Sequence, residues 1–357
     1  MAPELSRRSL LTIAGGLGAG YLLAGCGSDD EPSATGASGG GGELVVRTWS
    51  GVWEGAVNAM ASGFESASGI SLLNDPGSDT LTLLEQRPGE HDVAWLIGTD
   101  STRGMTDGTL EPIDTSRIER FAQINSRLSD GITHDGELSG VPISYTATGI
   151  IYNRDRLGFE ITSWEDLWRE ELRGQLCIQN APSIGGLFLV FTGARVFGSG
   201  ADDYEAGWKA IEELAPNVQF LFNTSSDGVS KLASGSVLAC VTIADQGVPL
   251  REQGIETVIP EEGTTYSIQS LTVPAESTNK DAAYEFINFM LDPDNQVEWS
   301  RNGKAAPSTT DVTLPDDLAS ELMETPAVAE SLWPIDWYEF GQQIPDWTTR
   351  WQRIFGS

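Results

Sequence analysis

The 357-residue chain carries 52 acidic and 21 basic residues, a formal net charge of −31 at pH 7. This excess of negative charge excludes nucleic acid as a partner, because phosphate binding needs basic patches, and it excludes simple electrostatic attraction to anionic lipid. Lysine is scarce among the basic residues, and an acidic, lysine-poor surface is typical of a halophile, in which salt screens self-repulsion. An ordinary acidic secreted protein is the alternative.

The first 26 residues predict export. Arg7 and Arg8 precede an apolar stretch at 10–24, which closes on Leu-Ala-Gly and Cys26. This stretch falls short of the ~20 residues that cross a bilayer, so a cleaved signal is favoured over a spanning helix. Leu-Ala-Gly-Cys resembles a bacterial lipobox, and the resemblance implies that Cys26 becomes a lipidated N-terminus after twin-arginine export. The alternatives are an uncleaved anchor and a chance cysteine.

After residues 1–26 are removed, we expect residues 27–43 to form a flexible linker, because this segment is rich in glycine and serine and has no hydrophobic periodicity. The expected location is the outer face of the cytoplasmic membrane, periplasmic or on the cell surface. The expected membrane contact is the lipid anchor alone.

From residue 43 onward, short apolar runs alternate with longer amphipathic ones. Strands are predicted at 43–49, 69–73, 92–97, 149–152, 175–179, 218–222, 237–243 and 270–273. Helices are predicted near 52–64, 163–171, 186–198, 203–214 and 280–291. This alternation predicts an α/β fold with parallel sheets covered on both faces. The length predicts two lobes, since about 315 ordered residues exceed one comfortable core.

Two cysteines and four late tryptophans carry structural expectations. Cys177 and Cys240 lie in apolar runs typical of buried strands, which favours two free thiols over a disulfide. The late tryptophans are expected to pack on the second lobe, because exposing them would leave a large apolar patch. They are Trp333, Trp337, Trp347 and Trp351.

Several segments resemble one family. Thr162-Ser-Trp-Glu-Asp-Leu-Trp168, followed by Leu172-Arg-Gly174, is similar to the TSWxDLW…kG segment of extracellular solute-binding proteins, nearest to the spermidine/putrescine-binding type of ABC importer. Further similar segments follow the family order: Gly140–Asn153, Leu271–Ala275 and Asn279–Met290. The spacing of Trp164, Leu167 and Trp168 is helical, so these residues are expected in the core rather than at a ligand.

The resemblance implies a periplasmic-binding-protein-like fold, in which two α/β lobes close on a ligand in the cleft between them. The lobe boundaries expected here are 44–147 with 268–310 for lobe 1, and 148–267 with 311–357 for lobe 2. The implied function is capture of a small amine-containing solute for the permease and ATPase subunits of an ABC importer. A monomer without a cofactor is expected.

Ligands of open α/β sheets bind beyond the carboxyl ends of strands, where helix N-termini present free N–H groups. This rule and the resemblance select the same five loops. The ligand-binding residues predicted in them are Trp49, Ser50, Gly51, Gly98, Thr99, Asn180, Ser183, Gly185, Asp245, Tyr266 and Gln269. The resemblance adds Lys304, near a position where the family places an aromatic contact. Each residue also has a purely structural explanation: Gly185, for example, would allow a tight turn, and Trp49 would fill space in the core.

The predicted cleft differs from that of the polyamine binders, which hold ammonium groups with carboxylates and aromatic faces. Gly51, Asn180 and Gln269 stand where the resemblance implies acidic residues, and Asp245 is the one carboxylate left in the predicted loops. Burying an ammonium group without a partner costs several kcal/mol. The sequence therefore predicts a ligand with one amine, such as an amino-acid-like zwitterion, and spermidine is the alternative.

Enzyme signatures are missing from the sequence. The two histidines, His91 and His134, lack metal-ligand spacing to another histidine or cysteine. No Gly-x-Ser-x-Gly elbow and no Walker-type phosphate loop is present. We therefore expect a binding protein with no catalytic residues and no metal site. The alternatives left open are an importer's binding protein for iron or another metal ion, and a surface lipoprotein without a transport role.

Overall fold

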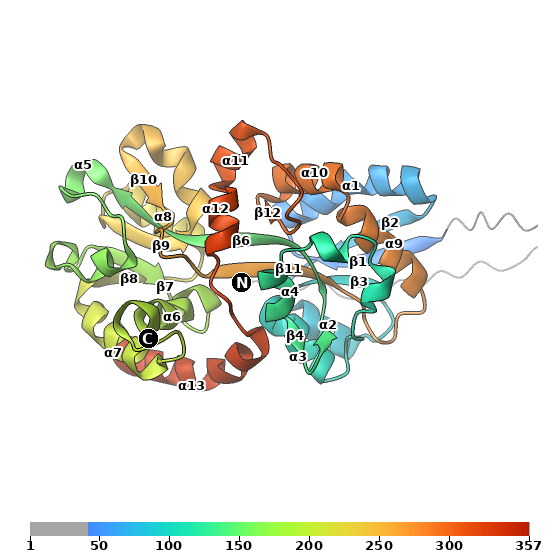
Figure 1. Cartoon of the computed structure of the whole chain (residues 1–357), viewed down its shortest axis with the longest axis horizontal. Helices are drawn as coiled ribbons and strands as arrows, with labels where there is room; N and C mark the ends of the chain where they lie inside the picture. The colour runs from blue at the N-terminus through green and yellow to red at the C-terminus, as the bar shows by residue number, and fades with distance from the viewer. Residues whose placement is uncertain (1–41, 357) are drawn as a thin grey trace, which may run out of the picture. The chain divides into compact units, whose positions relative to one another are not determined.

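The computed structural model describes residues 42–356, so the predicted signal, Cys26 and most of the predicted linker lie outside the described residues. Within this range, ten strands form one hydrogen-bonded array, which consists of two sheets that share one long strand, β6 (Val141–Asn153). The first half of β6 pairs with β11 (Tyr266–Thr272), and the second half pairs with β9 (Ala239–Ile243). β6 therefore runs from one sheet into the other, side by side with β11 (Figure 1).

Each sheet mixes parallel and antiparallel pairs. The first sheet has the order β2 (Ser71–Pro76), β1 (Glu43–Thr48), β3 (Val93–Ile97), β11, β6, with β12 (Ala306–Pro307) also on β6. The second has the order β6, β9, β7 (Leu176–Gln179), β8 (Val218–Phe222), with β10 (Ile255–Val258) also on β6. Neighbours are parallel within β2–β1–β3 and β9–β7–β8, whereas pairs that involve β6 or β11 are antiparallel. The expectation of parallel sheets is wrong in part, because β6, the strand that both sheets share, and β11 beside it pair antiparallel with their neighbours.

The remaining elements connect these strands. The α-helices are α1 (Val52–Ser68), α2 (Thr80–Gln86), α3 (Gly98–Thr106), α4 (Ser126–Gly131), α5 (Arg154–Leu157), α6 (Ile184–Phe197), α7 (Tyr204–Leu214), α8 (Ser225–Ala233), α9 (Lys280–Met290), α10 (Pro293–Gly303), α11 (Asp316–Leu322), α12 (Pro326–Ser331) and α13 (Trp337–Phe355). The 3-10 helices are η1 (Thr115–Arg117), η2 (Phe121–Gln123), η3 (Trp164–Trp168), η4 (Glu170–Leu172), η5 (Ala215–Asn217) and η6 (Ala244–Gln253). A hairpin of β4 (Thr133–His134) and β5 (Glu137–Leu138) stands apart from the two sheets.

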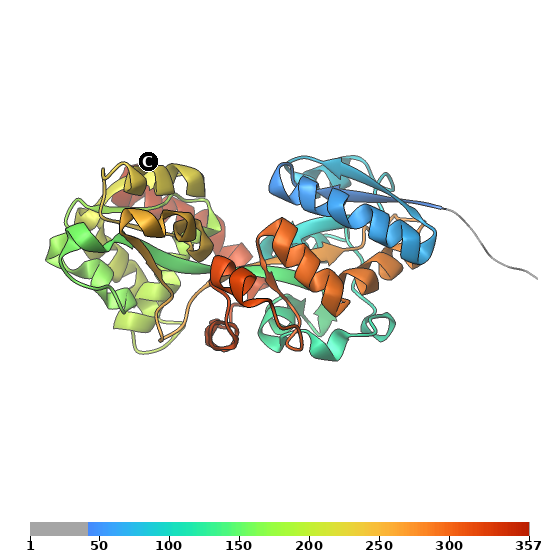
Figure 2. The ribbon, with the colours of Figure 1, turned by 90° about the horizontal axis from the view of Figure 1, so that it is seen from above.

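Helix α1 shows how the pattern builds one layer. Its buried positions, Ala56, Val57, Met60 and Phe64, repeat at three and four residues and form one face. The helix ends where Gly69 adopts a left-handed conformation with φ of 75°, which glycine adopts without a steric penalty. α1 and α10 lie side by side, the blue and orange helices at the right of Figure 2.

The predicted helix at 163–171 is wrong. Two 3-10 helices, η3 and η4, replace it, and Trp164 is buried as expected. The side-chain amide of Asn217 donates to the backbone oxygens of Leu167 and Arg169 at 2.8 and 3.0 Å. Because these two carbonyls bond a residue far along the chain, they are not available for an α-helical ladder.

The two cysteines are free and buried, as expected. Cys177 of β7 and Cys240 of β9 stand opposite each other in a parallel pair. Burial raises the pKa of the Cys240 thiol well above its ordinary value. Both therefore behave as small apolar side chains.

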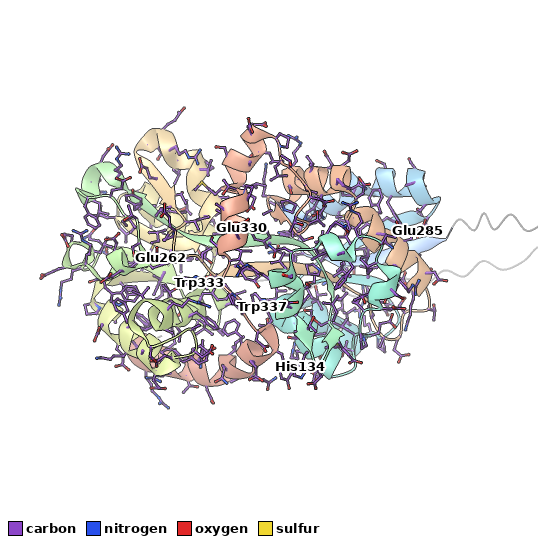
Figure 3. The ribbon with its side chains drawn as sticks, in the orientation of Figure 1. His134, Glu262, Glu285, Glu330, Trp333 and Trp337 are labelled. Carbon is purple, nitrogen blue, oxygen red and sulfur yellow. The ribbon has the colours of Figure 1, made fainter. Side chains whose placement is uncertain are left out.

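Helix α13 holds three of the four late tryptophans and packs against α3 and α6 (Figure 1). Trp347 contacts the rings of Phe191 and Trp208, at centroid distances of 5.5 and 5.8 Å. The indole N–H of Trp333, just before the helix, donates to the backbone oxygen of Glu262 at 2.9 Å. Both residues are labelled in Figure 3. All four late tryptophans are buried, so this C-terminal segment is part of the core.

Candidate functional site

The first predicted loop follows β1 at the edge of a tryptophan cluster. Trp49 is half-buried and meets the ring of Trp53 edge-on at 5.4 Å. Trp53 in turn contacts Trp95 and Trp299, which stack at 4.4 Å. Ser50 and Gly51 are exposed, and Gly51 adopts a φ of 83° before α1. The loop therefore presents an aromatic edge and no charge.

The second predicted loop lies in a helix. Gly98 and Thr99 form the first turn of α3 and are buried. A Cβ at Gly98 would overlap the ring of Trp337 and would lie 2.8 Å from Ile268 Cγ2. Trp337 of α13 therefore covers the carboxyl end of β3, a contact that the sequence did not indicate.

The third loop follows β7 and leads into α6. The indole N–H of Trp351 donates to Asn180 Oδ1 at 3.0 Å. Ser183 stands at the N-cap of α6, but its side chain makes no capping hydrogen bond. A Cβ at Gly185 would overlap Oε1 of Gln179. The absence of a side chain at Gly185 thus lets the helix begin close against the end of β7.

The fifth loop is a strand. Tyr266 and Gln269 lie on β11 and are buried. The Tyr266 hydroxyl donates to the backbone oxygen of Arg127 at 2.8 Å. The Ser144 hydroxyl of β6 donates to Gln269 Oε1 at 3.2 Å and accepts from the indole of Trp299 at 3.1 Å. Gln269 is therefore held by the neighbouring strand, with no charged group among its hydrogen-bond partners.

The fourth predicted loop forms the start of η6 and contains Asp245. The fold brings Asp245 and Lys304 close to Glu321 of α11, a residue that the sequence did not indicate. Lys304 Nζ lies 2.7 Å from Glu321 Oε1. Burial raises the pKa of Asp245 above its ordinary value, hydrogen bonds from Gln246 lower it, and the charges of Glu321 and Lys304 raise and lower it respectively. Gln246 Nε2 donates to Asp245 Oδ1 at 3.2 Å. Asp245 thus has an amide partner and no ion pair among the described residues, with a cation nearby.

A second carboxyl group lies on the same C-terminal segment. Glu324 stands between α11 and α12, and burial raises its pKa to about 7. It faces the buried hydroxyl of Tyr145 on β6. Burial raises the pKa of Tyr145 well above its ordinary value, and the charge of Glu324 and a hydrogen bond with its side chain raise it further. The segment from Asp316 to Glu324 therefore brings polar groups to the strand that joins the sheets.

Asp245, Lys304 and Glu321 form one charged group, and Gln269 and Ser144 form a polar pair on the adjoining strands. No hydrogen bond or ring contact within residues 42–356 links Trp49 or Gly98 to that charged group. The assignment of these residues to one ligand site stays a prediction. Glu321 is a functional candidate missed at sequence level, because the 311–357 segment carried no loop selected by the strand-end rule.

Metal binding and membrane spanning are two other roles to consider for the described residues. Residues 42–356 contain no group of three or more histidine, cysteine, aspartate or glutamate side chains placed to hold a metal ion. Over the same range, the helices are too short or too polar to span a membrane.

Comparison with known proteins gives consistent matches. The family model described as bacterial extracellular solute-binding protein matches residues 64–327. The spermidine/putrescine-binding periplasmic protein of Salmonella typhimurium is 26% identical over 282 residues, which cover 76% of this chain and 78% of that protein. The putrescine-binding periplasmic protein PotF of Escherichia coli is 26% identical over 278 residues, 68% of this chain and 74% of that protein.

Solved structures agree in fold. The crystal structure of an ABC transporter protein from Clostridium perfringens superposes with a TM-score of 0.78 at 27% identity, and the match covers 87% of this chain and 99% of that one. This likeness confirms the predicted α/β, two-lobed, periplasmic-binding-protein-like fold. The family is one of solute-binding transport proteins and not of enzymes. The chain belongs to the bacterial extracellular solute-binding protein family.

Proposed function

We propose that the chain captures a small solute with one ammonium and one carboxylate group, and delivers it to the permease and ATPase of an ABC importer. The observation that carries this proposal is the group of Asp245, Lys304 and Glu321. Asp245 has a raised pKa and no ion pair among the described residues, so a ligand ammonium would stabilise its charged form. Lys304 offers the opposite charge to a ligand carboxylate.

Polyamines fit this group less well. The named relatives bind spermidine and putrescine, which makes a polyamine the second candidate. However, one carboxylate of the group, Glu321, already pairs with the ammonium group of Lys304 at 2.7 Å. A polyamine would have to displace Lys304 or leave ammonium groups without partners, at a cost of several kcal/mol each.

The placement of the other predicted residues supports a site of low charge. Gly51 carries no side chain, Gln269 is bonded to Ser144 and Ser267, and Asn180 accepts from Trp351. None of the three supplies a carboxylate. The start of α6 beyond Ser183 has backbone N–H groups that suit a ligand carboxylate.

The remaining parts of the proposal concern attachment and organisation. We assign lipidation to Cys26, with residues 27–43 as the tether, on the strength of the twin-arginine and lipobox order. The lobes are proposed as 44–147 with 268–310, and 148–267 with 311–357, and a monomer is proposed. The passage of β6 from one sheet into the other supports the lobe proposal.

Titration calorimetry tests the proposal. The purified mature chain is titrated with spermidine, with putrescine and with a panel of amino acids, and each is repeated with Asp245→Asn. We expect an amino acid to bind and Asp245→Asn to weaken it by about tenfold or more, as expected for loss of a charge-assisted hydrogen bond. Tight spermidine binding that Asp245→Asn leaves unchanged would contradict the proposal.

A further inference from the structure

A cavity of about 820 Å³ has Arg127 on its wall, whose backbone oxygen accepts from the hydroxyl of Tyr266 at 2.8 Å. The end of α4, the second half of α6, the start of α7 and the first half of α13 form its walls. None of the twelve ligand-binding residues predicted from the sequence lines this cavity, which is built wholly from described residues. It is therefore a separate feature of the fold.

Arg195 on the cavity wall has no protein acceptor. Within residues 42–356 no group accepts a hydrogen bond from Arg195 and no carboxylate forms an ion pair with it, and its Nε is buried without a partner. Its guanidinium carbon lies 4.8 Å from the ring centre of Trp333, whose place beside Glu262 is seen in Figure 3. Burial lowers the pKa of Arg195, and the negative charge of Asp202 on the same wall raises it. The guanidinium fork is thus held by ring packing and is free to bind a carboxylate in a bidentate manner.

The other charged groups of the cavity decide what such a ligand must carry. A second arginine on the wall, Arg127, donates to the backbone oxygen of Leu332 at 3.0 Å and forms no ion pair with another described residue. Four carboxylates also line the wall: Asp130, Asp202, Asp336 and Glu339. None of the four forms an ion pair with a described residue. Four negative against two positive charges repel a simple anion, so a carboxylate ligand for Arg195 needs an ammonium group of its own.

Apolar side chains make up the rest of the wall. Phe340 and Trp347 of α13 meet at a centroid distance of 5.8 Å, and Phe191 of α6 lies 5.2 Å from Phe340. All three rings line the cavity. Such a wall suits the apolar or aromatic side chain of a ligand.

We propose that this cavity is a second binding site, which takes a zwitterion with an apolar or aromatic side chain. The ligand carboxylate binds the Arg195 guanidinium, its ammonium group lies among the wall carboxylates, and its side chain packs on the rings of Phe191, Phe340 and Trp347. The site does not use Asp245, so it is independent of the solute site proposed above.

The test uses three probes of one shape. L-Phenylalanine carries both charges, phenylethylamine lacks the carboxylate, and 3-phenylpropionate lacks the ammonium group. Equilibrium dialysis is run on the Asp245→Asn variant, in which binding at the solute site is expected to be weakened. We expect phenylalanine to bind with a Kd of about 1 mM or below, and each single-charge probe to bind about tenfold more weakly or worse.

Substitutions at Arg195 locate the binding. In the Asp245→Asn background, Arg195→Met keeps the stem that packs on Trp333 and should weaken phenylalanine binding about tenfold or more. Arg195→Lys keeps the positive charge but not the two-pronged guanidinium group, and it should retain part of the affinity for phenylalanine. Arg173→Met is the matched control, because Arg173 is exposed and lies outside the cavity, and it should change nothing. Circular dichroism melting checks that each variant is folded.

Two outcomes would overturn the inference. One is no phenylalanine bound to Asp245→Asn at about 10 mM ligand, a concentration that would fill a site of about 1 mM Kd. The other is binding that Arg195→Met and Arg173→Met leave equally unchanged. Either result leaves the solute site untouched, because that site is measured with the wild-type chain.

Discussion

Glu324 gives a pH-dependent test of the structure. The residue lies between α11 and α12, and burial raises its pKa from 4.5 to about 7. In the unfolded chain the carboxyl group ionises near its ordinary value. Replacing it by glutamine keeps the shape and removes the ionisation, so Glu324→Gln should isolate this contribution.

The direction in which Glu324 changes the folding stability with pH follows from proton linkage. Below a pH of about 4.5 both states hold the proton, and Glu324 contributes no pH dependence. As the pH rises from 4.5 to about 7, the unfolded state loses its proton while the folded state keeps it, so the folded state loses stability. Above about 7 the loss is complete, and the difference between the two pKa values corresponds to on the order of 3 kcal/mol as an upper limit.

Urea unfolding at a series of pH values from 4 to 8 measures this effect. Glu324→Gln should be as stable as wild type at the acid end and more stable by about 1–3 kcal/mol at the alkaline end. Glu330→Gln, which removes an exposed carboxylate on the next helix (Figure 3), is the control and should show no such trend. A wild-type curve parallel to that of Glu324→Gln across the whole range would refute the reasoning.

Three further predictions test other contacts. Gly98→Ala should lower stability by about 1–3 kcal/mol, because the new methyl group meets the Trp337 ring; a thermal melt equal to wild type would argue against the packing of α13 on α3. Trp351→Phe should cost about 1 kcal/mol by removing the hydrogen bond to Asn180, measured by urea unfolding, and an unchanged midpoint would show that this bond contributes nothing. Cys26→Ser should release the protein from the membrane fraction of its host, and equal membrane retention would rule out the lipid anchor.

Much of the fold was predictable because its signals are local. The run from Glu43 to Thr48 and the buried face of α1 follow from hydrophobic periodicity alone. Helices α6 and α7 begin and end within a few residues of the predicted bounds. The helix predicted at 163–171 was wrong, because the side chain of Asn217 donates to carbonyl groups of this segment. One of them, that of Leu167, is 50 residues away in the sequence, and no local pattern indicates such a contact.

For the candidate site too, the sequence indicated residues that follow local patterns and did not indicate residues that tertiary packing brings in. Asp245 was predicted because it comes two residues after the end of a buried strand, β9, where the strand-end rule applies. Glu321 and Trp337 were not found, because each reaches the site through packing of the C-terminal segment. Gly98 carried the opposite error: the rule placed it in an open loop, whereas Trp337 covers it.

We expect the solute site to take one ammonium and one carboxylate group, and this expectation has a sharp test. It is tested most directly by the calorimetric Kd values of 5-aminopentanoate and 1,5-diaminopentane, which differ only in the group at one end of the same chain. The amino acid should bind more tightly to wild type, and Lys304→Met should weaken the amino acid by about tenfold while leaving the diamine unchanged or tighter. Tighter binding of the diamine to wild type, with Lys304→Met affecting neither ligand, would contradict the claim.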